Sequence, residues 1–581
     1  MTGVKTTMIE LLFHPGIILI LGGIIAAVVP NRMRKVVMLG APLLAIRATL
    51  SLKVGTVWSS PFINNMDLVY LKADKLSLVF AVVFSVLAFL GSIYALHINQ
   101  RGETAETLVY AGSSLGVVFA GDWVTLIAFW EMMAISSAFL IWNNKTKRAI
   151  RAGFRYLLVH MLGGNLLLAG IFLKVTKGQF AVTSLTGTSD AAFWLILLAV
   201  SINAAIPPLH AWLTDAYPEG TVTGSVFLSS FTTKVAVYCL IRLFPGTQLL
   251  IWAGVIMAIY GVVFAVLEND IRRLLGYHII SQVGFMVAGA GMGTELALDG
   301  ATAHAFCHIL YKSLLFMGAG AVIYATGCKK LTQLGGLYRT MPVTAICFGI
   351  GAYSISGVPL FNGFISKSMT IRAAAVAQMP MVELLLYLAS IGTFLSIALK
   401  LNYFMFFGPD KGIKPKKIPF NMKAAMAGGS FLCVLYGLFP DLLYQRLPFE
   451  VEFTPYTADH VISTIQLLLA TLVAFWIMLP KMATHDVISI DTDWFYRKPF
   501  AALVWGIVRV SCKVRDNFGV WGNTILDAVV PFSKNPLKWA SHTAEGSVPA
   551  VYNEDQYRFP IGIAVLMSLI VFVITVSYIW L

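Results

Sequence analysis

The stretch AFWLILLAVSINAAIPPLHAWL, residues 192–213, decides the fold class of this protein. It carries no Asp, Glu, Lys or Arg, and a helix of this length crosses the ~30 Å hydrocarbon core of a bilayer. Pro207 and Pro208 remove backbone hydrogen bonds, which a membrane tolerates only where the irregular backbone is buried in protein or lines a polar cavity. We therefore expect a membrane-spanning helix that is broken in mid-span.

The rest of the chain has the same apolar character. Of its 581 residues 58% are hydrophobic and 12% are charged, about half the charge of an ordinary soluble protein. The apolar runs lack the period-two alternation of a membrane barrel. We predict an all-α, polytopic membrane protein of about 14–16 transmembrane helices. The expected spans lie near residues 8–30, 36–54, 76–97, 105–121, 123–142, 153–174, 192–213, 221–244, 249–267, 273–291, 299–325, 342–371, 383–407, 422–440, 461–480 and 559–581.

The net charge of +14 reflects membrane topology rather than nucleic-acid binding, because the Lys and Arg residues fall in short loops between apolar runs. Alternate threading of the spans places the basic loops 32–35, 145–151, 329–330 and 411–417 on one side. The positive-inside rule makes that side cytoplasmic and the N terminus external, as expected in a prokaryotic inner membrane. We interpret the first apolar run as a retained span and not a signal peptide.

A second predicted span is also interrupted. It contains SISGVPLFNGFISKS, residues 354–368, in which Gly357, Pro359 and Gly363 break the helix. Two broken helices, each within a similar apolar bundle, indicate an internal repeat that is inverted in topology. The predicted organisation is N-terminal helices at 1–100, repeats at 101–245 and 246–410, further spans at 411–480 and an extension at 481–581. Within the extension, the mixed polar and apolar segment 494–545 predicts a helix along the surface or across its neighbours.

Ionisable residues inside apolar spans are the main functional signal, because each costs ~2.5–3.5 kcal/mol at a helix centre. Glu131 lies in the middle of WVTLIAFWEMMAISSAFLIW, where its short side chain is poorly placed to reach the interface. Lys234 is the only ionisable residue of its span until Arg242 at the end. Its longer side chain keeps the alternative of snorkelling open.

The most specific pattern is HAFCHILYKSLLFMGAGAVI, in which His304, His308 and Lys312 stack on one helix face. A zinc site is disfavoured, since no HExxH glutamate or third ligand accompanies the histidines. Satisfied core histidines remain an alternative to a proton relay, which neutral imidazole is suited to form. Lys367, just after the second break, and Lys400 are further candidates for the ion path. The supporting polar residues are His160, Asn203, His210 and His278.

The chain lacks the motifs of a redox enzyme. Its six cysteines are scattered without CxxC spacing, and there is neither a GxGxxG nor a Walker loop. We expect no cofactor, no metal and no catalytic residues of its own.

Several phrases in fixed order resemble one known family. FWEMM, AAIPPLHAWLTDAYPEGTVTGSVFLSSFTTKVAVY, ENDIRRLLGYHIISQVGFM, HAFCHILYKSLLFMGAGAVI and GFISKS, between about residues 70 and 410, resemble the antiporter-like subunits of respiratory complex I, Mrp-type cation/proton antiporters and membrane-bound hydrogenases. The wording around IPPLHAWLTDAYPE is nearest to the branch that holds the D-type Mrp chains and the hydrogenase chains.

The resemblance implies a fourteen-helix core of two inverted five-helix repeats with a row of charged residues at mid-membrane. On the matching positions, Glu131 is the helix-five glutamate, Lys234 the bridging lysine, His304, His308 and Lys312 the central relay, and Lys367 the residue toward the exit. The family usually carries a lysine where this chain has Asn203. Glu131 then pairs with another group, stays protonated for longer or serves a different route, and Lys234 and His160 are the candidate partners.

The leading hypothesis is a proton or sodium/proton translocating subunit of a multisubunit membrane complex. Its expected partners are homologous antiporter-like subunits, small hydrophobic subunits, lipid, and protons or sodium ions, with no nucleic acid. The alternatives are a non-pumping structural subunit of a redox complex and a membrane subunit that assists quinone reduction. The sequence alone does not name the driving reaction.

Overall fold

The computed structural model describes residues 12–63, 66–482, 491–534 and 561–580. The chain divides into two compact units, Met1–Asp491 and Thr492–Leu581. Residues 8–11 of the first predicted span and 535–545 of the predicted lateral segment lie outside the described residues. The protein is predominantly helical, which confirms the predicted fold class.

The first unit contains the following elements: α2 (Pro15–Val28), α3 (Asn31–Ser51), β1 (Val57–Pro61), β2 (Asp67–Lys72), α4 (Lys75–Ala95), α5 (Arg101–Phe119), α6 (Trp123–Trp142), α7 (Lys147–Val175), α8 (Ala191–Asn203), α9 (Ala211–Ala216), η1 (Tyr217–Glu219), α10 (Gly224–Leu228), α11 (Thr232–Leu243), α12 (Gln248–Leu267), α13 (Ile271–Met292), α14 (Glu295–Thr326), η2 (Leu331–Gln333), α15 (Pro342–Ser356), α16 (Asn362–Val376), α17 (Pro380–Thr393), η3 (Phe394–Leu401), η4 (Tyr403–Phe407), α18 (Phe420–Leu438), α19 (Asp441–Tyr444) and α20 (Ala458–Met478). The second unit contains α21 (Asp493–Phe495), η5 (Tyr496–Phe500), α22 (Ala501–Lys534) and α24 (Ile561–Trp580).

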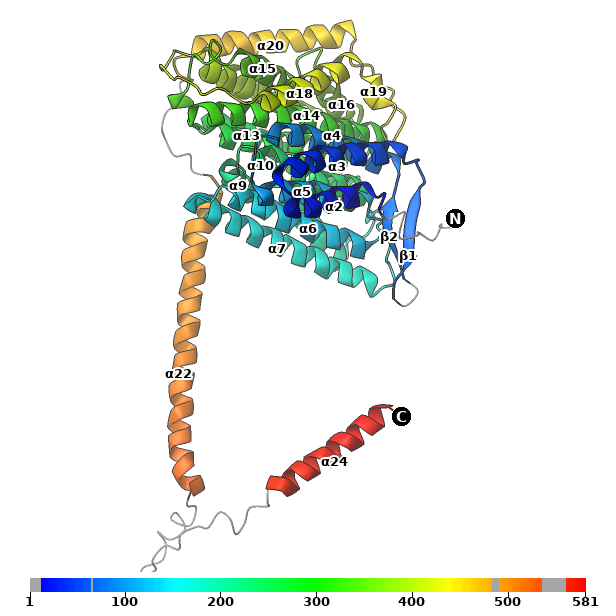
Figure 1. Ribbon diagram of the computed structural model, residues 1–581, viewed down its shortest axis with the longest axis vertical. Coiled ribbons are helices and arrows are strands. Elements are labelled where there is room, and N and C mark those ends of the chain that lie inside the picture. The colour runs from blue at the N-terminus through cyan, green and yellow to red at the C-terminus, as the bar shows by residue number, and fades with distance from the viewer. Residues whose placement is uncertain (1–11, 64–65, 483–490, 535–560, 581) are drawn as a thin grey trace, which may run out of the picture. The chain divides into compact units, whose positions relative to one another are not determined.

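Helices of the first unit pack side by side into one bundle, with α13 and α14 at its centre (Figure 1). Every residue of α13 except Arg273 is buried, as expected of a helix surrounded by others. Among the described residues, nine helices are long and apolar enough to cross a membrane. The fold is that of a polytopic membrane protein.

A two-stranded antiparallel hairpin, β1–β2, lies at one end of the bundle (Figure 1). The helical prediction did not include it. Its strands, VWSSP and DLVYLK, are rich in β-branched and aromatic residues, which is the usual strand signal. Their shortness hid that signal among the much longer apolar runs.

Both predicted helix breaks are present. The first separates α8 from α9 at residues 204–210, and the second separates α15 from α16 at residues 357–361. At the second break Gly357 ends α15 with φ of +72°, a left-handed conformation that glycine adopts without strain. A third interruption, at Ser229–Phe231 between α10 and α11, was not predicted because no proline or glycine marks it.

The basic loops meet at one end of the bundle. Asn144 donates to the carbonyl of Glu219 at 2.8 Å, and Arg272 donates to the next carbonyl, Gly220, at 2.8 Å. The loop before α13 then pairs with the chain at Lys330, and the Lys416 N–H donates to Ala325. These contacts bring the loops 145–151, 329–330 and 411–417 to the same end of the bundle, as the threading predicts for these three loops.

Candidate functional site

Three buried lysines lie against helix ends. Lys234 donates to the carbonyl of Ser229, at the interruption before its own helix, at 2.5 Å. Lys367 donates to Ile355, in the last turn of α15, at 2.7 Å. Lys400 donates to Val266, in the last turn of α12, at 2.5 Å. Helix C-terminal carbonyls carry partial negative charge, so these helix ends stabilise the three buried ammonium groups.

At the centre, Lys312 and His308 are fully buried in α14. Neither the Lys312 ammonium nor either ring nitrogen of His308 has a hydrogen-bond partner among the described residues. His308 is within electrostatic reach of Lys234, Lys312, His304 and Lys367. Buried polar groups are normally satisfied by protein or by ordered water, so these atoms require water or an exchanging proton.

His304 continues this line toward the second break. Its Nδ1 lies 3.2 Å from the Ser366 hydroxyl of α16, next to Lys367 in sequence. The Lys367 ammonium lies 5.2 Å from the centre of the Phe285 ring, a cation–π distance. A cavity of about 420 Å³, lined by Lys367, Ser356, Tyr387, His460 and Ser463 among others, adjoins it.

His278 and Lys400 form a second branch. His278 Nε2 lies 2.7 Å from the hydroxyl of Ser396, and His278 is within electrostatic reach of Lys312, Lys367 and Lys400. Ser396 and Lys400 both lie in η3, which is a π-helix continuing α17. π-Helical turns inside helices are frequent at functional sites because they re-aim side chains.

The amino-terminal residues are arranged differently. Glu131 is half-buried on α6 and lies against α7 at Gly164. Asn203 is buried on α8, near Gly163 of α7 and beside His160. In the described part of the chain, neither Lys234 nor His160 forms a hydrogen bond or ion pair with Glu131. The structure therefore supplies neither of the two partners suggested for it.

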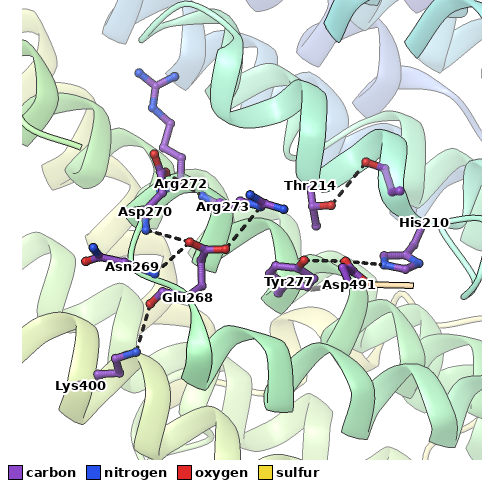
Figure 2. Close-up of polar contacts among 11 residues, drawn as sticks. His210, Thr214, Glu268, Asn269, Asp270, Arg272, Arg273, Tyr277, Lys400 and Asp491 are labelled. Carbon is purple, nitrogen blue, oxygen red and sulfur yellow. Dashed lines mark hydrogen bonds and ion pairs between the residues drawn. The ribbon is translucent and has the colours of Figure 1, made fainter. Parts of the chain in front are cut away.

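A polar cluster missed by the sequence analysis surrounds His210, at the end of the first break (Figure 2). Its Nε2 lies 3.1 Å from Oδ2 of Asp491. The hydroxyls of Tyr260 and Tyr277 also donate to the Asp491 carboxylate. Burial by itself raises the pKa of Asp491, but the hydrogen bond and charge of His210, with the two tyrosine hydroxyls, hold that pKa below its ordinary value.

Beside this cluster, a second set of contacts fixes the loop between α12 and α13 (Figure 2). The Glu268 carboxylate accepts from the backbone N–H groups of Asn269 and Asp270 and lies 3.4 Å from Arg273. The Glu268 carbonyl accepts from Lys400 at 3.1 Å. No sequence pattern joins Asp491 to His210 or Glu268 to Lys400, because these partners are far apart along the chain.

The comparisons with known proteins agree with this architecture. Residues 120–396 match the family described as NADH:quinone oxidoreductase/Mrp antiporter, TM. An uncharacterised protein of Methanocaldococcus jannaschii is 32% identical over 63% of this chain and 81% of its own length. The D-type chain of the Na(+)/H(+) antiporter of Alkalihalophilus pseudofirmus is 32% identical over 51% of this chain and 64% of its own length.

A solved structure shares the fold. A chain of the Mrp complex from Dietzia sp. DQ12-45-1b superposes with a TM-score of 0.75 at 24% identity, over 93% of this chain and 64% of its own. These matches indicate one family of membrane subunits. The two broken helices and the buried lysines and histidines are the features that the sequence motifs of this family predict. The chain belongs to the NADH:quinone oxidoreductase/Mrp antiporter membrane-subunit family.

Proposed function

We propose that this chain is an ion-translocating subunit of a multisubunit membrane complex, moving protons or exchanging protons for sodium. The observation that carries the proposal is the buried line Lys234, Lys312, His308, His304 and Lys367, with unsatisfied polar atoms at its centre. The similarity to a chain of the Alkalihalophilus pseudofirmus Na(+)/H(+) antiporter supports it. The N terminus is proposed to lie outside a prokaryotic inner membrane.

Charge moves along the line by neighbouring titrations. Protonating one group makes the next cation less favourable, and two unit charges 4 Å apart interact by ~4 kcal/mol at an effective dielectric of about 20. Lys367 and Lys234 can return to helix-end carbonyls when charged, whereas Lys312 has no such partner among the described residues. Lys312 is therefore the group whose charge state the line controls. The cavity beside Lys367 is the proposed access route for water.

The test uses the purified complex in liposomes, with a pH dye inside and an imposed sodium or potential gradient. Lys312→Gln removes the titratable group and is expected to lower proton flux at least tenfold. Lys417→Gln, on an exposed loop, is the matched control and should keep the native rate. Native flux in the Lys312→Gln complex, at equal assembly, would rule out the proposed role of this line.

A structural subunit with an inactive amino-terminal path is the second candidate. It is favoured by Asn203 in place of a lysine and by the absence of a described partner for Glu131. In that case the Lys312→Gln and native complexes have the same flux. If the chain instead assists quinone reduction, Lys312→Gln should lower the reductase activity of the intact complex and leave passive ion flux constant.

A further inference from the structure

Asp491 stands outside the matched family region and outside the line described above. It follows α20 in the chain, and its carboxylate is buried beside the first helix break. The family match ends at residue 396, so this carboxylate is not among the positions that the family motifs assign. The role of Asp491 is therefore inferred from its own contacts.

The site bridges the two halves of the bundle. His210 ends the break before α9 and Tyr277 belongs to α13 (Figure 2). Tyr260 belongs to α12. The rings of His210 and Tyr260 also pack edge to face, with centroids 4.9 Å apart. Tyr277 directly precedes His278 of the second branch. A change of charge at Asp491 is thus felt by both halves.

The contacts fit an ionised carboxylate. Both tyrosines donate to it, one to each oxygen, and His210 Nε2 faces Oδ2. His210 Nδ1 is buried and has no hydrogen-bond partner among the described residues. With Nε2 held by the carboxylate, Nδ1 is the nitrogen left to give or take a proton. Two other charged side chains lie near the cluster, Arg273 and Glu268. They pair with each other at 3.4 Å, and both interact electrostatically with Tyr277.

We propose that Asp491 is a positioning residue of the ion path, which fixes the His210 ring at the first break through Nε2 and leaves Nδ1 to exchange a proton with the path. This inference rests on the proposed ion transport. His210 Nε2 carries the hydrogen that faces Asp491 Oδ2, so an added proton enters at Nδ1 and takes the pair from a charge of −1 to zero. The tyrosine hydroxyls keep their own protons.

The experiment measures proton flux in the reconstituted complex. Asp491→Asn keeps the shape but removes the charge that faces the Nε2–H of His210, so the ring is no longer held in one orientation. Flux is expected to fall several-fold. Asp491→Glu restores the carboxylate and should keep most of the native flux, as should the matched control Asp441→Asn on the exposed start of α19. An Asp491→Asn complex with native flux overturns the inference, including when only its yield falls.

A second measurement does not depend on transport. Hydrogen exchange by mass spectrometry on the whole complex reports the peptide covering residues 204–216. Faster exchange in Asp491→Asn than in Asp491→Glu supports a charge pair at the break. Equal exchange in the two variants overturns it. If the native complex shows no flux, the proposed function fails, and this measurement alone decides the pairing.

Discussion

At the residue scale, the position of Glu131 is set by a glycine on the neighbouring helix. A Cβ atom built on Gly164 would lie 1.7 Å from Oε1 of Glu131, whereas one on Gly163 meets its nearest atom, Asn203 Oδ1, at 3.5 Å. A methyl group therefore fits at Gly163, whereas at Gly164 it would displace the Glu131 carboxylate. At Gly164, α7 comes so close to α6 that only a residue without a side chain leaves room for the Glu131 carboxylate.

Gly164→Ala is accordingly expected to push Glu131 away from α7 and to lower flux several-fold. Assembly should be retained, because the end of a flexible side chain can move at small cost. Gly163→Ala is the matched control, since its added methyl makes an ordinary van der Waals contact. Flux assays with both variants check this. A Gly164→Ala complex as active as Gly163→Ala would show that the place of Glu131 does not matter for transport.

At the element scale, α4 and α11 are joined by Asp74 and Arg242. Asp74 caps α4 in a capping box with Ser77, and Arg242 Nη2 donates to both of its oxygens at 2.8 and 2.6 Å. Partial burial raises the pKa of Asp74, but the charge of Arg242 and the hydrogen bonds outweigh it and hold this pKa below its ordinary value. One side chain thus serves both the helix end and the contact between helices.

Replacing Asp74 by Ala should lower the free energy of unfolding by about 1 kcal/mol, because both cap and ion pair are lost. Asn still caps, so Asp74→Asn should cost less; the pair is partly exposed and screened. A lowered folded-state pKa gives stability that is present above the unfolded-state pKa and lost as pH falls through the folded value. The difference between native and Asp74→Asn should therefore vanish in acid. Thermal melts in detergent at several pH values test it, and a difference that grows in acid would contradict it.

At the scale of the whole molecule, the first unit has a hydrophobic core of its own, which its own helices build from Leu19 to Phe475. The buried residues of the described chain all lie in the first unit. Deleting residues 501–581 should therefore leave the helix content and melting temperature of the remaining chain nearly unchanged. Circular dichroism and thermal melts in detergent check this. A melting temperature lower by about 10 °C or more would mean that the second unit contributes to the core.

The sequence by itself determined the membrane class, the helical architecture and both proline- or glycine-marked breaks. Apolar run length and helix-breaking residues are local properties, and the bilayer allows only helices and closed barrels to satisfy the backbone, of which the barrel needs a period-two pattern that these runs lack. It also singled out Glu131, Lys234, His304, His308, Lys312, Lys367 and Lys400, since an ionisable residue in an apolar run is visible without neighbours. Their roles in transport stay predictions.

Only the tertiary structure decided which partners these groups have. The carbonyls of Ser229, Ile355 and Val266 that receive the lysines belong to helix ends, and a backbone oxygen leaves no mark in the sequence. Asp491 reaches His210 across 281 positions of the chain, so no spacing rule could join them. Charge in a low-dielectric interior is governed by distance in space, and folding alone sets that distance.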